Sequence, residues 1–221
     1  VEELTWALDQ GARAIVMRAA APTTADRGRC DPFDPPFHDF WQLANDAGIT
    51  VVLHAGDGGV SSNGFAPDGF AATFGSAWKP SIKQFAIEQA IRDYFLTMVF
   101  DRHLERFPNL RIASVENGAE YLGDLFKKLR SAANKLPGWF ADDPVDVFRE
   151  HVWINPFWED DVDEVVGYMG ADRVLFGSDW PHIEALPAPR DYVREVKHLD
   201  ADDRRQILRD NARALLQLRP T

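Results

Sequence analysis

The sequence predicts an α/β fold in which about five strand–helix units build a parallel sheet. Two observations carry this prediction: strand-like apolar runs alternate with helical segments along the chain, and polar residues follow the strands at their carboxyl ends. The predicted strands are Ala12–Met17, Thr50–Leu53, Leu110–Val115, His151–Ile154 and Arg173–Phe176. Two architectures fit this order, a (β/α)8 barrel of which the chain supplies about five units and an open five-stranded sheet.

Helices are expected between these strands. The first ends at Gly48, because glycine suits the left-handed backbone of a helix C-cap. The expected helices are Phe37–Ala47, Ile82–Arg106, Ala119–Asn134, Val145–Glu150, Glu159–Gly170, Arg190–Leu199 and Ala201–Leu216. The long segment after His54 is rich in glycine and small residues, which predicts a lid or substrate loop, with a surface excursion as the alternative.

Composition and charge narrow the class of protein and of ligand. The 221 residues are 45% apolar, which suffices for one domain with a hydrophobic core, taken as residues 1–221. The net charge is −11 and the sequence has no cluster of Lys and Arg, which excludes nucleic acid and an anionic membrane surface as binding partners. The charge favours a small-molecule substrate instead. No apolar run approaches the roughly 20 residues of a membrane helix, and a single cysteine fits a cytoplasmic protein.

Polar and metal-capable side chains follow four of the predicted strands. His54 ends the second strand, Glu116 the third and Asn155 the fourth, while Asp179 and His182 follow the fifth. In parallel α/β folds the carboxyl ends of the strands meet at the active site. Ionisable groups are costly to bury unless they are paired or bound to metal, and zinc accepts both histidine nitrogen and carboxylate oxygen. The pattern therefore predicts a metal held by His54 and Asp179.

Each of these assignments has a structural alternative. His54 could be a core histidine bonded to a backbone carbonyl, and Asp179 could cap the following turn. Glu116 could form a salt bridge, and Asn155 could bond only the backbone at its strand end. The other histidines are not expected to be ligands; they are His38, His103, His151 and His198.

Several segments resemble the amidohydrolase-related family, which includes aminocarboxymuconate semialdehyde decarboxylase and the resorcylate-type decarboxylases. The segments that match its fifth, sixth and eighth strands are DPFDPPFHDFWQLANDAGITVVLHAGD, FDRHLERFPNLRIASVENGAEYL and VLFGSDWPHIEAL. HVWINPFWEDDV fits between them as the seventh. The resemblance extends from about Gly11 to Leu216, and VVLHAGD and GSDWPH are fairly specific in that order and spacing.

The resemblance implies a distorted (β/α)8 TIM barrel, of which this chain supplies about the last five units. Val1 opens a stretch typical of the middle of a helix, and three further strands are expected upstream of it. By position, His54 matches the family's fifth-strand metal ligand and Asp179 its eighth-strand ligand. The family often has histidine where Glu116 stands, and its first-strand His-x-His pair has no counterpart in this sequence. Metal binding by this segment alone is therefore expected to be weak.

The matched residues imply a metal-dependent hydrolase or nonoxidative decarboxylase that acts on a small carboxylate- or carbonyl-bearing substrate. The metal is a divalent ion, zinc in the first place and manganese as the alternative. The expected catalytic residues are Asp179, Glu116 and His182, and the expected substrate contacts are Asn155, Trp180 and Glu184. The alternative function is a catalytically inactive barrel that binds a small ligand or serves as a scaffold. The apolar helix FAIEQAIRDYFLTMVFDRHL predicts a homodimer contact, with packing on the barrel as the alternative.

Overall fold

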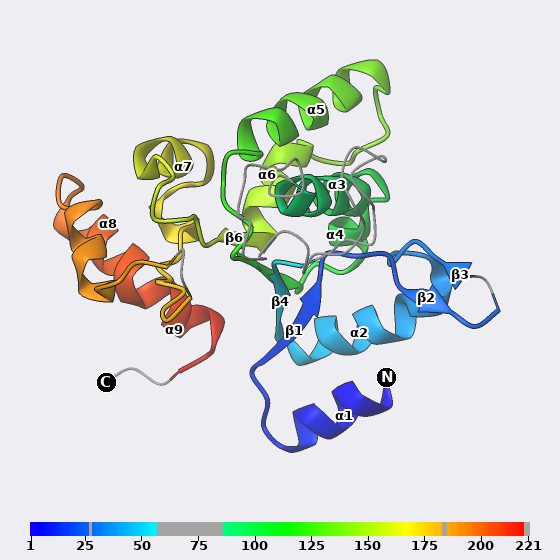
Figure 1. The fold of residues 1–221 in the computed structure, drawn as a ribbon. Helices are drawn as coiled ribbons and strands as arrows, with labels where there is room; N and C mark the ends of the chain where they lie inside the picture. The colour runs from blue at the N-terminus through cyan, green and yellow to red at the C-terminus, as the bar shows by residue number, and fades with distance from the viewer. Residues whose placement is uncertain (27, 57–85, 183–184, 219–221) are drawn as a thin grey trace, which may run out of the picture.

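The computed structural model describes residues 1–26, 28–56, 86–182 and 185–218. Within them, four parallel strands form a sheet in the order β1–β4–β5–β6 (Figure 1). The strands are β1 Ala14–Arg18, β4 Thr50–His54, β5 Arg111–Val115 and β6 Val152–Ile154. Because each neighbouring pair is parallel, the carboxyl ends of all four lie along one edge of the sheet. The predicted parallel α/β fold is confirmed for these strands.

The side chains of β4 alternate between two environments, which sets the direction in which the site residues project. Val51 and Leu53 are fully buried in the main core, whereas Val52 is half-buried and His54 is exposed. In the register of the sheet His54 lies opposite Val115. The residue that follows Val115 therefore begins its turn beside His54, at the carboxyl edge of the sheet.

The predicted strand Arg173–Phe176 is wrong as a strand, because only one bridge, between Ile154 and Val174, is formed there. The Leu175 N–H still donates to the Ile154 carbonyl at 2.8 Å, but the Phe176 N–H donates to the Ile207 carbonyl at 3.1 Å. Ile207 belongs to a π-helical turn over Gln206–Asp210, in which backbone carbonyls are displaced from the usual α-helical pattern. The hydrogen-bond pairing with β6 therefore ends at Phe176, because the N–H of Phe176 bonds the helical Ile207 carbonyl and not the sheet.

Helices connect and cover the strands (Figure 1). They are α1 Glu2–Asp9, α2 His38–Ala47, α3 Ala86–Phe100, α4 His103–Arg106, α5 Leu122–Lys135, α6 Pro144–His151, α7 Val162–Met169, α8 Ala201–Arg205 and α9 Asn211–Leu215. Gly48 ends α2 in the left-handed conformation with φ of 57°, as expected from its lack of a Cβ. Asp161 begins α7 by accepting hydrogen bonds from the Asp163 and Glu164 amides.

Three local features differ from the sequence prediction. The segment expected as a helix over Arg190–Leu199 is a 3-10 helix over Pro189–Arg194, and further short 3-10 helices span Pro35–Phe37 and Ala171–Arg173. The expected long helix before β5 is divided, because Arg102 adopts φ of 54° between α3 and α4. A pair of antiparallel two-residue strands, β2 Thr23–Thr24 and β3 Gly28–Arg29, was not predicted. The predicted lid after His54 lies almost wholly outside the described residues.

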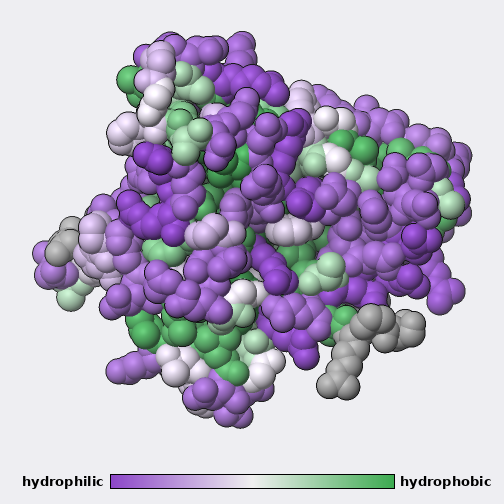
Figure 2. Space-filling model, turned by 180° about the vertical axis from the view of Figure 1, so that it is seen from behind, coloured by the Kyte–Doolittle hydropathy of each residue, from purple (hydrophilic) through white to green (hydrophobic). Residues whose placement is uncertain are grey.

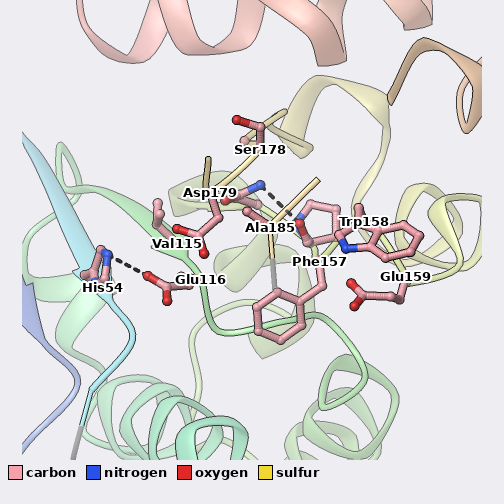
Figure 3. Close-up of a pocket in the computed structure, with 12 residues that line it drawn as sticks. His54, Val115, Glu116, Phe157, Trp158, Glu159, Ser178, Asp179 and Ala185 are labelled. Atoms are coloured by element: carbon pink, nitrogen blue, oxygen red, sulfur yellow. Dashed lines mark hydrogen bonds and ion pairs between the residues drawn. The ribbon is translucent and has the colours of Figure 1, made fainter. Parts of the chain in front are cut away.

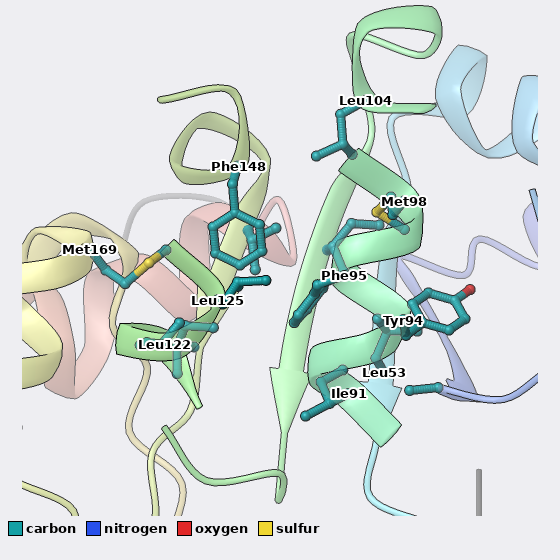
Figure 4. Close-up of a cluster of buried hydrophobic side chains, with 14 of the residues drawn as sticks. Leu53, Ile91, Tyr94, Phe95, Met98, Leu104, Leu122, Leu125, Phe148 and Met169 are labelled. Atoms are coloured by element: carbon teal, nitrogen blue, oxygen red, sulfur yellow. The ribbon is translucent and has the colours of Figure 1, made fainter. Parts of the chain in front are cut away.

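The core fills the layer between the sheet and helices α3, α5 and α6 (Figure 4). Phe95 of α3 packs edge-to-face on Phe148 of α6 with ring centroids 5.0 Å apart, and Phe148 meets Phe126 of α5 in the same way. Leu53 from β4 and Leu122 from α5 are fully buried in this layer. The packing fixes the helix-facing side of the sheet, so that the strand ends are held at a constant spacing.

The surface is mostly hydrophilic, with hydrophobic residues gathered in small areas of the face shown in Figure 2. Large apolar side chains that are exposed include Val16 on β1 and Trp6 on α1, at 68% and 63%. Among the described residues, no helix has the length and apolar character needed to cross a bilayer.

Candidate active site

The ends of β4 and β5 bring His54 and Glu116 into direct contact. Nε2 of His54 lies 2.8 Å from Oε2 of Glu116. Nδ1 of His54 lies 2.9 Å from the Ala55 carbonyl, and since a carbonyl can only accept, Nδ1 carries the hydrogen. That bond fixes the orientation of the ring and directs Nε2 towards the carboxyl edge of the sheet.

The turn after the bridge residue Val174 adds two more groups to the same place. Nδ1 of His182 lies 3.4 Å from Oδ2 of Asp179 and 3.9 Å from Oε1 of Glu116. One donor atom each from Glu116, Asp179 and His182 falls within 4.8 Å of the others. Figure 3 shows the Glu116 carboxylate between His54 and Asp179. The structure thus brings together four of the residues that the strand-end pattern selected.

Both carboxylates stand on left-handed backbone, and at Glu116 this conformation is strained. Glu116 has φ of 59° and Asp179 has φ of 54°, in a region that aspartate visits with little penalty but that glutamate rarely adopts. For glutamate such a conformation costs of order 1 kcal/mol or more and persists where the surroundings impose it. The left-handed backbone turns each carboxylate from its strand end into the shared space, which is the arrangement expected of a functional site.

Asn155 holds the turn that carries Asp179. Its Nδ2 donates to the Pro156 carbonyl at 3.2 Å and to the Leu175 carbonyl at 3.3 Å, so part of its role is the backbone bonding considered as the alternative. A Cβ on Gly177 would lie only 2.7 Å from Oδ1 of Asn155, so only glycine permits this approach without a shift. The Asn155 side chain also lines the pocket, and its contact with substrate stays a prediction.

A pocket of about 260 Å³ opens at these residues (Figure 3). Its lining comes from the strand ends and from the loop after β6: His54, Val115, Glu116, Asn155, Pro156, Phe157, Trp158, Glu159, Gly177, Ser178, Asp179 and Ala185. His54 and the carboxylates of Glu116 and Asp179 lie towards one side, and the aromatic rings of Phe157 and Trp158 lie towards the other with Glu159 beside them (Figure 3). This combination suits a small, partly apolar ligand with charged or polar substituents. Trp180, predicted as a substrate contact, is 63% exposed and does not line this pocket. Glu184 lies outside the described residues.

Two further polar residues support the site and were not selected from the sequence. Nδ2 of the buried Asn117 donates to the Leu53 carbonyl at 2.8 Å and to the Val115 carbonyl at 2.9 Å, which ties the ends of β4 and β5 together. Oδ2 of Asp160 accepts from the Phe157 N–H at 2.7 Å. The sequence signals for them were weak: Asn117 is the middle residue of ENG, and Asp160 follows NPFW by two positions. Only the tertiary contacts give these two residues their roles.

Acidic groups gather behind the aromatic wall of the pocket. Burial raises the pKa of Glu88 to about 6, with smaller contributions from the charges of Glu120 and Asp160. Burial likewise raises the pKa of Asp160 to about 6, helped by Glu120 and Glu159 and opposed by hydrogen bonds from the backbone of Phe157 and Ala119. Both carboxylates therefore take up a proton at a higher pH than exposed carboxylates do.

The donor set fits a divalent metal. Two carboxylates and an imidazole converge, and the Nε2 atom of a second, backbone-oriented imidazole borders them. Carboxylate oxygen suits manganese and magnesium, and imidazole nitrogen suits zinc. The assignment of His54 and Asp179 as ligands stays a prediction, and the geometry adds Glu116 and His182 as candidates.

Residues 2–218 match the sequence profile of a family described as amidohydrolase. No functionally curated protein matches the chain. Among solved structures, an amidohydrolase from Mycobacterium avium subsp. paratuberculosis K-10 is 35% identical with a TM-score of 0.86. That match covers 99% of this chain but only 54% of the Mycobacterium protein.

Two decarboxylases share the fold at lower identity. The 2,6-dihydroxybenzoate decarboxylase from Rhizobium is 21% identical with a TM-score of 0.73, and the match covers 98% of this chain and 66% of that one. A dihydroxybenzoic acid decarboxylase from Polaromonas sp. JS666, solved with manganese and the inhibitor 2-nitroresorcinol, is 19% identical with a TM-score of 0.75. There the match covers 100% of this chain and 65% of the relative. The chain thus has the fold of about five units of a TIM barrel and spans one half to two thirds of these relatives.

Proposed function

The chain belongs to the amidohydrolase family, and on that premise we propose that it carries most of the active site of a metal-dependent enzyme acting on a small carboxylate. The reaction we place first is nonoxidative decarboxylation of an aromatic acid. The alternative reaction for the same site is hydrolysis of a carbonyl-bearing substrate. The ion is manganese or zinc. The remaining ligands would come from residues that lie outside this chain, since it contains no His-x-His pair.

One observation carries the proposal: Glu116, Asp179 and His182 converge within 4.8 Å at the carboxyl edge of a parallel sheet. Two of these side chains stand on left-handed backbone, which for Glu116 is costly and is unnecessary for an ordinary surface salt bridge. A scaffold protein without catalytic function has no need to maintain this strain. The convergence therefore favours the enzyme over the inactive barrel.

Asp179 and Glu116, with His54 beside them, are the residues that would hold the ion. Bound there, a divalent metal supplies Lewis-acid polarisation of a substrate oxygen. His182 and Asp179, with Nδ1 and Oδ2 3.4 Å apart, form the pair that holds a proton next to the pocket. This pair is the candidate proton donor and acceptor of the reaction.

The pocket supports an aromatic acid as the first substrate class. The Phe157 and Trp158 rings offer an apolar wall to a planar ring, while Asn155 and the carboxylate group offer polar contacts on the other side. In decarboxylation the bond between the ring carbon and the carboxylate carbon breaks, CO₂ leaves, and the ring carbon gains a proton in its place. The Asp179–His182 pair is the source that we assign to this proton. The decarboxylases that share the fold act on substrates of this class.

The test combines metal content with turnover. The longest natural form of the protein is loaded with Mn²⁺ or Zn²⁺, its metal is measured by plasma mass spectrometry, and CO₂ release from 2,6-dihydroxybenzoate and related hydroxybenzoates is followed. We expect about one metal per chain, and a loss of both metal and turnover of at least ~100-fold in Asp179→Asn. Asp191→Asn, which removes one partner of an exposed ion pair with Arg194, is the matched control and should change neither.

Each result has a distinct meaning for this proposal. Metal binding with turnover of an ester or amide instead of a hydroxybenzoate would assign hydrolysis. Absence of metal from both wild type and Asp179→Asn, after loading, would refute the enzyme and leave the inactive barrel. An unchanged metal content in Asp179→Asn would remove Asp179 from the ligand set.

A further inference from the structure

Asp160 links two loops that each contribute a residue to the lining of the pocket, the loop after β6 and the turn after β5. Its Oδ2 accepts from the Phe157 N–H at 2.7 Å, and its carboxylate also accepts from the backbone of Ala119. Phe157 lies in the loop after β6 and is a wall of the pocket, whereas Ala119 ends the turn after β5 that begins with Glu116. One half-buried carboxylate therefore bonds the backbone of the wall and the backbone of the metal-site turn.

The two loops also touch through a close packing contact beside Asp160. Gly118 has φ of 66°, and a Cβ at this position would lie 2.8 Å from Cε2 of the Phe157 ring. The ring thus rests directly on the backbone of the turn, where only glycine leaves it enough space. A shift of Phe157 away from this turn would enlarge the pocket at the side facing Glu116.

The electrostatic surroundings make this link unusual for a structural carboxylate. The charged groups that face Asp160 are Glu120, Glu159 and Glu88, all acidic. Backbone amides of Phe157 and Ala119 donate to its carboxylate, so two N–H donors hold the residue against the repulsion of its neighbours. Replacement of Asp160 should therefore change the positions of the two loops that its carboxylate bonds.

We propose that Asp160 is a positioning residue that sets the distance between the Phe157 wall and the Glu116 turn, and that Phe157 thereby determines which substrates fit. The proposal rests on the proposed function for its substrate, 2,6-dihydroxybenzoate as the probe, but its structural part concerns this chain alone. Asp160 does not line the pocket and is not among the candidate ligands. Its replacement should therefore change the recognition of substrate more than it changes the binding of metal.

The test compares Asp160→Ala with Asp161→Ala. Asp161 is the next residue and accepts two backbone hydrogen bonds as the N-cap of α7, so its loss removes a similar set of bonds without reaching the pocket. Both variants should lose a similar ~2–4 °C in melting temperature. Only Asp160→Ala should raise KM for 2,6-dihydroxybenzoate, by about 10-fold, with kcat and Mn²⁺ affinity changed much less. Asp160→Asn, which keeps one acceptor oxygen, should restore part of the affinity.

A second readout does not depend on the substrate. In amide NMR spectra, Asp160→Ala should shift the signals of Phe157 and Ala119 together with those of the turn at Glu116, whereas Asp161→Ala should shift only the first turn of α7. An Asp160→Ala spectrum with an unperturbed Glu116 turn would overturn the positioning role, even if the wild type showed no metal and no turnover. An equal KM effect from Asp161→Ala would overturn it as well, since general destabilisation would then explain the loss. Absence of wild-type turnover with the expected NMR shifts would reject the proposed reaction and retain the link.

Discussion

The histidines at the sheet edge and those in the scaffold occupy opposite environments. The side chains of His54 and His182 are 45% and 59% exposed and face the carboxylate of Glu116. His103 is fully buried among aromatic rings, and neither of its ring nitrogens has a hydrogen-bond partner among the described residues. The same residue type is thus placed once where it can exchange a ligand or a proton and once where it can do neither.

The difference lies in what surrounds each ring. Burial lowers the pKa of His103 to about 3, with smaller effects from the positive charge of Arg106 and from His38. That histidine is neutral throughout the physiological range and contributes packing. His54 is oriented by one backbone bond and keeps Nε2 directed at a carboxylate, which is the pattern of a metal-ligating histidine. Function is therefore marked by orientation and partners and not by the presence of histidine.

The largest expected effect is a loss of metal affinity when a histidine at the sheet edge is replaced. In His54→Asn, Mn²⁺ binding measured by calorimetry or chelator competition should weaken by at least ~100-fold, or roughly 3 kcal/mol, because one ligand nitrogen is lost. The free energy of unfolding of the metal-free protein should stay within ~0.5 kcal/mol of wild type, since the side chain is half exposed.

His198→Asn is the matched control for this change. His198 has the same 45% side-chain exposure and pairs with a carboxylate, Asp163, at 2.6 Å, but it lies away from the pocket. Its replacement should leave Mn²⁺ affinity unchanged. Equal affinities of wild type and His54→Asn would exclude His54 from the metal site.

The sheet-edge residues were predictable because parallel strands place their carboxyl ends together wherever the strands occur. His54, Glu116 and Asp179 each follow a recognisable apolar run, so their convergence needed no knowledge of side-chain contacts. The roles of Asn117 and Asp160 were not predictable, because they depend on which carbonyl or amide of another loop comes within bonding distance.

The scaffold shows the same limit. His103 lies between charged residues in the sequence DRHLER, a pattern that gives no sign of full burial. The strand predicted over Arg173–Phe176 was lost because the Phe176 N–H bonds a carbonyl in a distant π-helical turn, and neither the turn nor its partner has a local sequence signal. Secondary structure that depends on a tertiary partner is thus the part that sequence patterns miss.

The second prediction concerns stability in acid. The folded pKa of His103 is about 3, below the roughly 6.5 of an unfolded histidine, so the unfolded state binds more protons between these values. The contribution of His103 is favourable above pH 6.5 and is lost as the pH falls towards 3, by roughly 2 kcal/mol at pH 5. His103→Leu should abolish this loss and should also remove two unsatisfied buried nitrogens.

Urea unfolding at pH 7.5 and pH 5.0 measures this effect. Wild type should lose more stability between the two pH values than His103→Leu, by the amount given above. His198→Leu serves as the surface control and should keep the wild-type pH dependence. A His103→Leu variant with the same acid sensitivity as wild type would show that His103 is accessible to protons in the folded protein.

The smallest expected effect concerns a half-buried carboxylate, Glu88, compared with an exposed one. Burial raises the pKa of Glu88 to about 6, above the ordinary 4.5 of a glutamate, so the folded state binds an extra proton between these two pH values. The contribution of Glu88 is therefore most favourable below about pH 4.5 and is lost as the pH rises through 6. Glu88→Gln should raise the free energy of unfolding by about 1 kcal/mol at pH 7.5, after allowance for solvent screening of a half-buried group, and should leave it unchanged at pH 4.5. Glu150→Gln, on an exposed side chain, should show no such pH-dependent gain, and a gain of equal size there would mean that net charge, not burial, governs the effect.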